Sequence, residues 1–275
     1  MERATSDQAL HKIWRYEGGT FSESLDSVLR EHLLSVYLEG SLLVKLICIP
    51  EYLEELALGY LFSEGFITCI DDVAHIAIEG ASAYVKLAEA PEEAVAAEEG
   101  DVVTTDSGDF VKNPFKAKRP LDYSLARSAD WDPEVVLKNA NVLLEKSEIF
   151  KTTGNVHSVM VCQGAEVLYF CEDIGRYNAF DKCLGRALKD RADLGRACVY
   201  TSGRIPSSVA LKAVHAGIPM IVSRSAPTDA TLEIAQRYGL TVIGFARGSK
   251  FSVYVPDLEG LERVSKSVSK TANNY

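Results

Sequence analysis

Residues 169–185 read YFCEDIGRYNAFDKCLG and change character halfway, where an apolar stretch ends at Glu172 and Asp173 and an amphipathic pattern begins. Gly175 and Arg176 stand between the two patterns. The apolar side chains after them recur at helical spacing; they are Ala179, Phe180, Cys183, Leu184, Ala187 and Leu188. The stretch therefore predicts a strand, a charged turn and a helix. Asn178 suits an N-cap with Asp181 in the first turn, and it equally suits a ligand contact beside Asp173.

The same alternation runs through the second half of the chain. The segments VHSVMVC, AEVLYF, ACVYTS, IPMIVS, LTVIGFA and FSVYVP have the composition of strands, and NAFDKCLGRALKD, PSSVALKAVHAG and DATLEIAQRYG the spacing of helices. A further helix is predicted over 132–150, with Asp132 as N-cap and Pro133 at its first position. Alternating strands and helices predict an α/β fold, in which residues 133–275 form a three-layer α/β/α domain with a mixed, mostly parallel sheet.

The first half predicts a smaller α+β domain over residues 1–111. Residues 33–49 have the pattern of two strands around a Glu39-Gly40 turn, and residues 71–90 that of a hairpin with Gly80 in its turn. Between them, residues 50–65 have helical spacing and end at Gly65. Residues 112–132 are predicted to be a linker or loop, because residues 101–132 mix Gly, Pro, Ser and charge without periodicity.

Composition and charge restrict the function. The sequence has no apolar run of membrane-spanning length and no signal-peptide core near its start, so we expect a soluble cytoplasmic protein. The net charge is −10, but residues 151–250 hold 13 Lys+Arg and 8 Asp+Glu, a balance of +5. The remaining residues hold 16 Lys+Arg (29 − 13) and 31 Asp+Glu (39 − 8), a balance of −15. This distribution argues against a nucleic-acid binder and favours a small anionic ligand.

Four predicted strands are followed by an arginine, in the sequences EDIGR, TSGR, SRSAPT and ARGSK; these are Arg176, Arg204, Arg224 and Arg247. Ligands of open α/β sheets bind outside the carboxyl ends of the strands, and helix N-termini there favour anions. Guanidinium groups bind phosphate or carboxylate bidentately. The sequence therefore predicts a phosphate-bearing ligand at one sheet edge. Its further candidate contacts are His157 in TTGNVHS, with Asp173, Asn178, Ser202, Ser223 and Ser225.

The six cysteines are spaced singly, with no Cys-x-x-Cys pair for zinc or a redox dithiol. Each lies in an apolar stretch and is interpreted as a small core residue; they are Cys48, Cys69, Cys162, Cys171, Cys183 and Cys198.

The motifs TTGNVHS, EDIGRYNAFDKCLG, TSGRIPSSVALKAVHAGIPMIVSRSAPT and GLTVIGFARGSKFSVY, with LEELALGYLFSEGFI in the first half, resemble the FdhD-type formate dehydrogenase accessory proteins. The resemblance implies a cytidine-deaminase-like second domain, a homodimer, and sulfur transfer from a cysteine desulfurase to the molybdenum bis(molybdopterin guanine dinucleotide) of formate dehydrogenase. It also implies no resident metal and a cofactor-binding segment that matches Phe245, Ala246, Arg247, Gly248, Ser249 and Lys250.

This chain departs from the family pattern at the cysteine loop. The family carries CGxCG between its domains, whereas the matching stretch here is TTDSGDFV, with Ser107 where the motif begins. A serine hydroxyl cannot carry a transferable sulfur, because that chemistry requires a thiolate. Tyr177 and Asn155 also replace a usual His and Gly. Three readings follow: a cofactor-binding chaperone without sulfur transfer, which we favour, a substitute cysteine, or a second paralogue.

Two other function classes fit the predicted fold. A zinc nucleobase deaminase requires His/Cys-x-Glu and Cys-x-x-Cys, whereas Val159 stands two residues after His157 and the cysteine pair is missing. A plain guanine-nucleotide-binding regulatory module predicts nucleotide binding without any effect on formate dehydrogenase.

Overall fold

The larger sheet lies in the second half of the chain in this computed structural model, which describes residues 8–89 and 131–255. Within those ranges it has six strands in the order β12-β11-β10-β9-β7-β8. They are β7 (His157–Gln163), β8 (Glu166–Asp173), β9 (Cys198–Thr201), β10 (Met220–Ser223), β11 (Thr241–Arg247) and β12 (Lys250–Val255). β9, β10 and β11 pair in parallel, whereas β7 pairs antiparallel with both β8 and β9, and β12 antiparallel with β11.

The predicted mixed sheet is confirmed, but parallel pairing is confined to three strands. Only Gly164 and Ala165 connect β7 to β8. A connection of two residues can join antiparallel strands but is too short to join parallel ones. Since β7 runs opposite to both of its neighbours, β8 and β9 run in the same direction, and β10 and β11 run parallel to β9. Their carboxyl ends therefore lie at one edge, as the sequence predicts.

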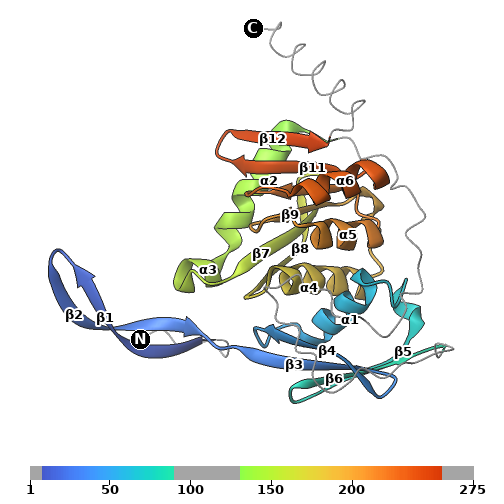
Figure 1. Cartoon of the computed structure of the whole chain (residues 1–275), viewed down its shortest axis with the longest axis horizontal. Helices are drawn as coiled ribbons and strands as arrows, with labels where there is room; N and C mark the ends of the chain where they lie inside the picture. Colours follow the sequence, from blue (N-terminus) through green and yellow to red (C-terminus); the bar gives the residue numbers. More distant parts are fainter. Residues whose placement is uncertain (1–7, 90–130, 256–275) are drawn as a thin grey trace, which may run out of the picture.

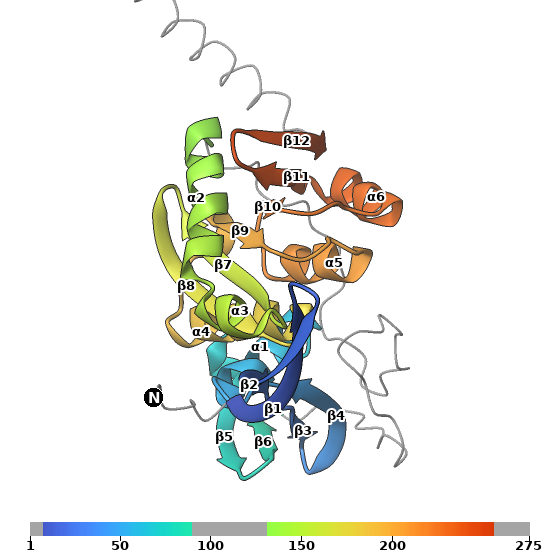
Figure 2. The same ribbon diagram turned by 90° about the vertical axis from the view of Figure 1, so that its left-hand side faces the viewer.

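Helices cover both faces of this sheet (Figure 2). The first face carries α2 (Pro133–Lys146) and α3 (Glu148–Thr153), and the second α4 (Arg176–Lys189), α5 (Ser207–His215) and α6 (Asp229–Tyr238); the short 3₁₀ turn η2 (Leu194–Arg196) precedes β9. The Asp132 carboxylate accepts the Glu134 N–H at 2.8 Å, so the predicted start of α2 is confirmed. The predicted single helix over 132–150 is wrong, since the backbone leaves helical geometry at Ser147, with ψ of 73°.

A smaller four-stranded sheet in the first half has the order β4-β3-β6-β5 within the described residues. Its elements are β3 (His32–Leu38), β4 (Ser41–Cys48), α1 (Leu53–Ser63), the 3₁₀ turn η1 (Ile70–Asp72), β5 (Val73–Glu79) and β6 (Ser82–Leu87). The predicted hairpins and helix are confirmed. Gly40, Gly65 and Gly80 adopt positive φ at the predicted turns. The predicted linker over 112–132 and the boundary at residue 111 lie almost wholly outside the described residues.

The chain also has an arm to which the sequence patterns assign no element. β1 (Gln8–Glu17) and β2 (Thr20–Leu29) pair with each other as a two-stranded antiparallel ribbon, which projects from the body (Figure 1). Gly18 and Gly19 form its turn with φ of 60° and 87°. Leu29 at its base packs with Ile49 and Val156.

Helices α1 and α4 hold the two halves together through direct backbone contact. A Cβ atom on Gly59 would lie 1.8 Å from the Asp181 carbonyl oxygen, and one on Gly185 would lie 1.8 Å from the Glu55 carbonyl oxygen. Only glycine allows so close a crossing. One continuous hydrophobic core therefore runs from the small sheet through both helices to the large sheet.

A buried ion pair reinforces this junction. The Asp173 carboxylate lies 2.6 Å from the Lys182 ammonium, and both side chains are fully buried. Asp173 also accepts the Ile49 N–H at 3.1 Å, while Lys182 donates to the Ile49 carbonyl at 3.1 Å. The end of β8 and the middle of α4 are thereby bonded to the backbone that follows β4.

Asn178 belongs to the same junction, and its predicted role as N-cap is wrong. Gly175 is the N-cap of α4, which begins at Arg176, so Asn178 is the third residue of the helix. Its amide donates to the Ile47 carbonyl at 2.7 Å and to Asp173 at 2.9 Å. The side chain satisfies buried acceptors across the junction rather than the helix end.

A second buried network links α1, α4 and α5. The Lys212 ammonium lies 3.0 Å from Asp181 and 2.8 Å from Glu64, and it donates to the Ser63 hydroxyl at 2.7 Å. Burial raises the pKa of Asp181 to about 6, although Lys212 opposes this. Burial acts to lower the pKa of Lys212, but the two carboxylates outweigh it and raise that pKa.

No helix of the described ranges has the length and apolar character that a bilayer span requires.

We predict that Lys182→Met lowers the free energy of unfolding by about 3–5 kcal/mol, because it leaves the Asp173 carboxylate buried without its counter-ion. Lys189→Met, on the same helix, removes only half-exposed ion pairs with Glu54 and Glu55 and should cost at most about 1 kcal/mol. Urea unfolding followed by circular dichroism measures both. Equal losses in the two variants would show that the buried pair does not hold the junction.

Candidate ligand-binding site

The predicted loops lie side by side at one sheet edge, and hydrogen bonds connect them. Ser202, after β9, accepts the Ser158 N–H through its hydroxyl at 3.0 Å. Ser223, at the end of β10, donates to the Gly203 carbonyl at 2.6 Å and accepts the Ser225 N–H at 2.8 Å. The Phe245 N–H donates to the Ser225 carbonyl at 2.9 Å. The start of β7 and the ends of β9, β10 and β11 thus form one bonded edge.

His157 stands at this edge, at the start of β7, between the ends of β8 and β9. A Cβ atom on Gly203 would lie 3.2 Å from the His157 ring nitrogen Nδ1 and 3.6 Å from the Cβ atom of Arg176. The structure therefore brings together a histidine and an arginine that are 19 residues apart in sequence (176 − 157). The absence of a side chain at Gly203 permits that approach.

A cavity of about 410 Å³ opens at the edge beside α3. Three of the predicted ligand residues line this cavity, namely His157, Ser202 and Arg224. The other lining residues are Leu143, Leu144, Ser147, Phe150, Gly154, Asn155, Val156, Ser158 and Ile174. Arg224 is half-buried, and its guanidinium donates to the Ala140 carbonyl at 3.2 Å, which holds the cation at the wall. The cavity combines an apolar wall with a few polar groups, as small-molecule sites do.

The β11–β12 hairpin forms the outer rim of the edge. Phe245 has φ of 54° and an exposed ring (37%), and the Arg247 guanidinium lies 5.9 Å from the centre of that ring. Ala246 is buried, whereas Arg247, Gly248, Ser249 and Lys250 are exposed. A register shift between Gly244 and Arg247 interrupts the strand pairing. Such a bulge redirects side chains, and here the exposed ones are an aromatic face and two cations.

The remaining predicted residues divide between surface and interior. Arg204 is exposed and Arg176 is half-buried at the start of α4. Asp173 and Asn178 are buried in the junction described above, where each already has several partners. Ser107 lies outside the described residues.

A buried carboxylate that sequence reasoning missed lies behind the cavity. Glu172 is 8% exposed and accepts the N–H groups of Ile149 and Phe150 at 3.1 and 3.2 Å. The Ser158 hydroxyl lies 3.3 Å from Glu172 and 2.6 Å from that of Ser147. Burial raises the pKa of Glu172. Glu172 stands in the EDIGR motif, but only the folded position of α3 reveals its partners.

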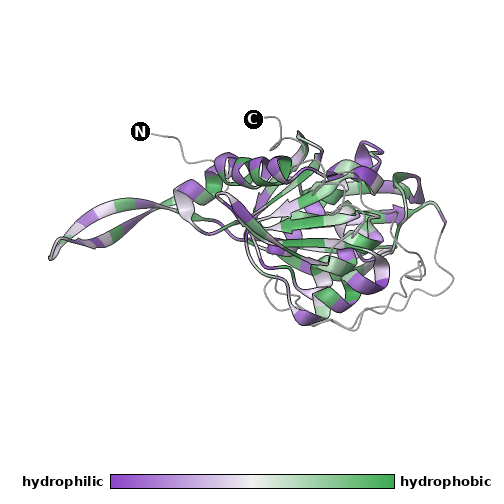
Figure 3. Cartoon of the chain, turned by 90° about the horizontal axis from the view of Figure 1, so that it is seen from above, coloured by the Kyte–Doolittle hydropathy of each residue, from purple (hydrophilic) through white to green (hydrophobic). Residues whose placement is uncertain are grey.

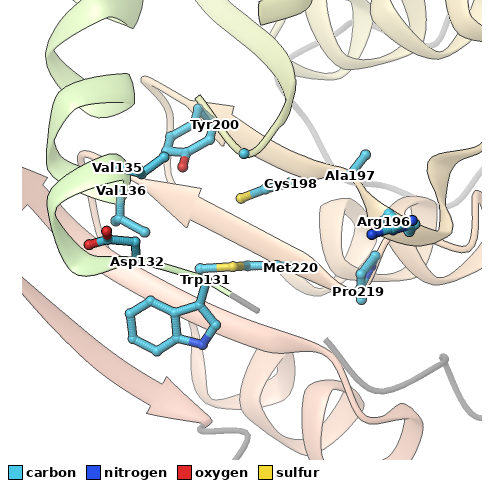
Figure 4. A pocket seen from close by; sticks show the side chains of 11 residues that line it. Trp131, Asp132, Val135, Val136, Arg196, Ala197, Cys198, Tyr200, Pro219 and Met220 are labelled. Carbon is cyan, nitrogen blue, oxygen red and sulfur yellow. The ribbon is translucent and has the colours of Figure 1, made fainter. Parts of the chain in front are cut away.

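A second cavity, of about 240 Å³, lies at the opposite end of the strands (Figure 4). Its walls come from α2 and the starts of β9 and β10. The labelled side chains include Trp131, Arg196, Cys198, Tyr200 and Met220 (Figure 4). It contains none of the predicted ligand residues. Because ligands of α/β sheets bind at the carboxyl ends of the strands, the first cavity is the stronger candidate.

The cysteines are mostly interior, with one correction. Cys48, Cys162, Cys171 and Cys183 are buried and Cys198 is half-buried, but Cys69 is exposed and is not a core residue. Burial raises the pKa of both Cys48 and Cys162 to about 12. Cys69 lines a cavity of about 220 Å³ with Arg191, against α4.

The fold and the edge define a mixed α/β protein with exposed cations on the rim of its larger sheet. The model of the FdhD/NarQ family matches residues 29–258, and the chain belongs to this family. It is 33% identical to the sulfur carrier protein FdhD of Listeria monocytogenes over an alignment of 277 positions, and the alignment covers 92% of this chain and 97% of that protein. It is 33% identical to that of Bacillus subtilis over 261 residues, covering 90% and 95%.

The fold also matches a crystal structure from Desulfotalea psychrophila, of a protein described as a formate dehydrogenase accessory protein. The TM-score is 0.73 at 23% identity, and the match covers 91% of this chain and 97% of that one.

We predict that native protein reacts with iodoacetamide at Cys69 alone, since it is the exposed thiol among the six. Burial protects four of the other five, Cys171 included, although a hydrogen bond with Cys183 lowers the Cys171 pKa. Cys198 is half-buried, but desolvation raises its pKa and so keeps its thiol protonated. Intact-mass spectrometry should show one adduct on native wild type, none on Cys69→Ser, and six on the unfolded chain. Rapid labelling of native Cys69→Ser would show that a second thiol is accessible.

Proposed function

We propose that this protein is an accessory protein for formate dehydrogenase that binds molybdenum bis(molybdopterin guanine dinucleotide) along the described edge. The observation that best supports this proposal is the exposed pair of Phe245 and Arg247 in the β11–β12 hairpin. A hydrogen bond from the Phe245 N–H to the Ser225 carbonyl connects this hairpin to the loops beside the cavity. Family membership supports the accessory role. The layered sheet, with α2 on one face and α4, α5 and α6 on the other, supports the cytidine-deaminase-like architecture.

The residues of the edge suit a large phosphate-bearing ligand. Phe245 offers an exposed ring for stacking a guanine base, and Arg247 and Lys250 offer cations for a pyrophosphate. Ser202 and Arg224 line the cavity next to His157 and can bind further polar atoms of the ligand. The ligand is cargo, held by hydrogen bonds and charge until a client enzyme accepts it.

Sulfur transfer forms a separate part of the proposal. The named relatives are sulfur carriers, and in that role a cysteine desulfurase would supply sulfur and the catalytic subunit of formate dehydrogenase would receive the sulfurated cofactor. Ser107 stands at the matching position and cannot form a persulfide. We propose that this chain holds the cofactor as a homodimer without carrying sulfur itself. A guanine-nucleotide-binding regulatory module is the alternative.

We predict that GDP binds the wild-type protein and that Arg247→Ala weakens this binding by about 10- to 100-fold, through the loss of charge-assisted bonds to phosphate. Isothermal titration calorimetry measures both. Arg237→Ala is the matched control, because Arg237 lies on α6 over Tyr238 and away from the rim. If neither GDP nor the pterin dinucleotide binds the wild type, the proposed edge is wrong.

We predict that incubation with a cysteine desulfurase and cysteine leaves no persulfide on the native protein. Mass spectrometry of the alkylated chain detects the added sulfur, and a family member with the CGxCG loop serves as positive control. A persulfide on Cys69, absent from Cys69→Ser, would instead establish a substitute carrier.

Deletion of the gene should lower formate dehydrogenase activity, whereas a plain nucleotide-binding module predicts no change.

A further inference from the structure

The arm formed by β1 and β2 has one apolar face. Directly paired residues of an antiparallel ribbon share a face, and the register pairs Leu10 with Ser27, Lys12 with Leu25, Trp14 with Glu23 and Tyr16 with Phe21. Five large apolar side chains thus lie on that face, and all are exposed: Leu10 (53%), Trp14 (69%), Tyr16 (64%), Phe21 (69%) and Leu25 (61%).

The opposite face of the arm is mainly polar. It carries the pairs His11 and Asp26, Ile13 and Ser24, Arg15 and Ser22, and Glu17 and Thr20, with Ala9 and the exposed Val28 (43%) paired at its base. The arm extends away from the rest of the molecule (Figure 3), with its base beside α3 and its turn farthest out. One face therefore has the composition of an interface and the other that of a surface.

A two-stranded ribbon of this kind needs a partner. An isolated hairpin is at best marginally stable in water, and a cluster of exposed aromatic side chains marks an interaction site. Since the arm is part of every chain, a partner that is present whenever the chain folds suits it best. A second copy meets that condition.

Charge also favours a second copy on this face. The whole chain carries −10, so two copies repel each other over most of their surfaces. Residues 8–29 hold 2 Lys+Arg and 3 Asp+Glu, a balance of −1. On the apolar face the Lys12 ammonium lies 2.7 Å from the Glu23 carboxylate, which neutralises both. The arm can meet its own copy with little repulsion.

We propose that the apolar face of the arm is a homodimer interface, on which the same face of a second copy packs antiparallel. The five side chains together expose roughly 500 Å² of apolar surface. Two faces would bury about 1,000 Å², the area that a specific interface requires. In an antiparallel pair the two-fold axis passes near the middle of the arm, close to Lys12, and each turn reaches the base of the partner arm.

Analytical ultracentrifugation of the full chain tests this inference. Wild type should be a dimer at micromolar concentration, and Trp14→Ser/Phe21→Ser should raise the dimer dissociation constant by about 100-fold or more. The matched control His11→Ser/Arg15→Ser alters the opposite face and should remain a dimer. An unchanged thermal midpoint would show that the variants remain folded. A monomeric wild type, or a dimer that survives in Trp14→Ser/Phe21→Ser, overturns the proposal.

Cross-linking tests the antiparallel arrangement. In a Cys69→Ser background, Lys12→Cys should form a disulfide-linked dimer under mild oxidation, because Lys12 lies near the two-fold axis on the buried face. Ser24→Cys, at the same level on the opposite face, should stay monomeric on a non-reducing gel. Equal cross-linking of the two would contradict the arrangement. The inference specifies the surface of the homodimer in the proposed function, and its tests use no ligand, so either can fail alone.

Discussion

A carboxylate buried without partners would be too costly to keep, and Asp173 shows how this fold meets that constraint. The group lies at the end of β8, fully buried, and is neutralised by Lys182. Its oxygens also accept bonds from Asn178 and from the N–H groups of Gly175 and Ile49. These partners come from the start of α4, its middle and the first half of the chain. One buried charge therefore sets the start of a helix and the junction of the two halves.

The junction in turn makes the candidate site rigid. The α1–α4 crossing at Gly59 and Gly185 leaves no room for one helix to shift against the other without a clash. The end of β8, the start of α4 and the loop after β9 are therefore held in one arrangement. Sites built on such supports keep their geometry without the ligand. The β11–β12 rim is held to the same support through Ser223 and Ser225.

The exposed cations of the edge and the exposed thiol lie in different parts of this molecule. The cations and the aromatic ring of the edge lie within the described structure, while the one exposed thiol, Cys69, lines a different cavity beside Arg191. Burial raises the pKa of Cys48 and Cys162, which keeps these two thiols protonated and makes them poor nucleophiles. This separation is consistent with the proposal that the chain holds a cofactor without carrying sulfur itself.

The sequence by itself determined the elements whose pattern is local. Helical spacing, the Asp132-Pro133 cap and the turn glycines predicted most helices and hairpins, and the arginines after four strands predicted the edge. Only the tertiary structure decided which of these groups are exposed at the edge and which are buried. Asp173 and Asn178 lie in the same motif as Arg176, yet contacts with Ile47 and Ile49, more than 100 residues away, draw them inside. Glu172 and the exposure of Cys69 likewise depend on packing partners distant in sequence, and no local pattern encodes which distant backbone will satisfy a buried polar group.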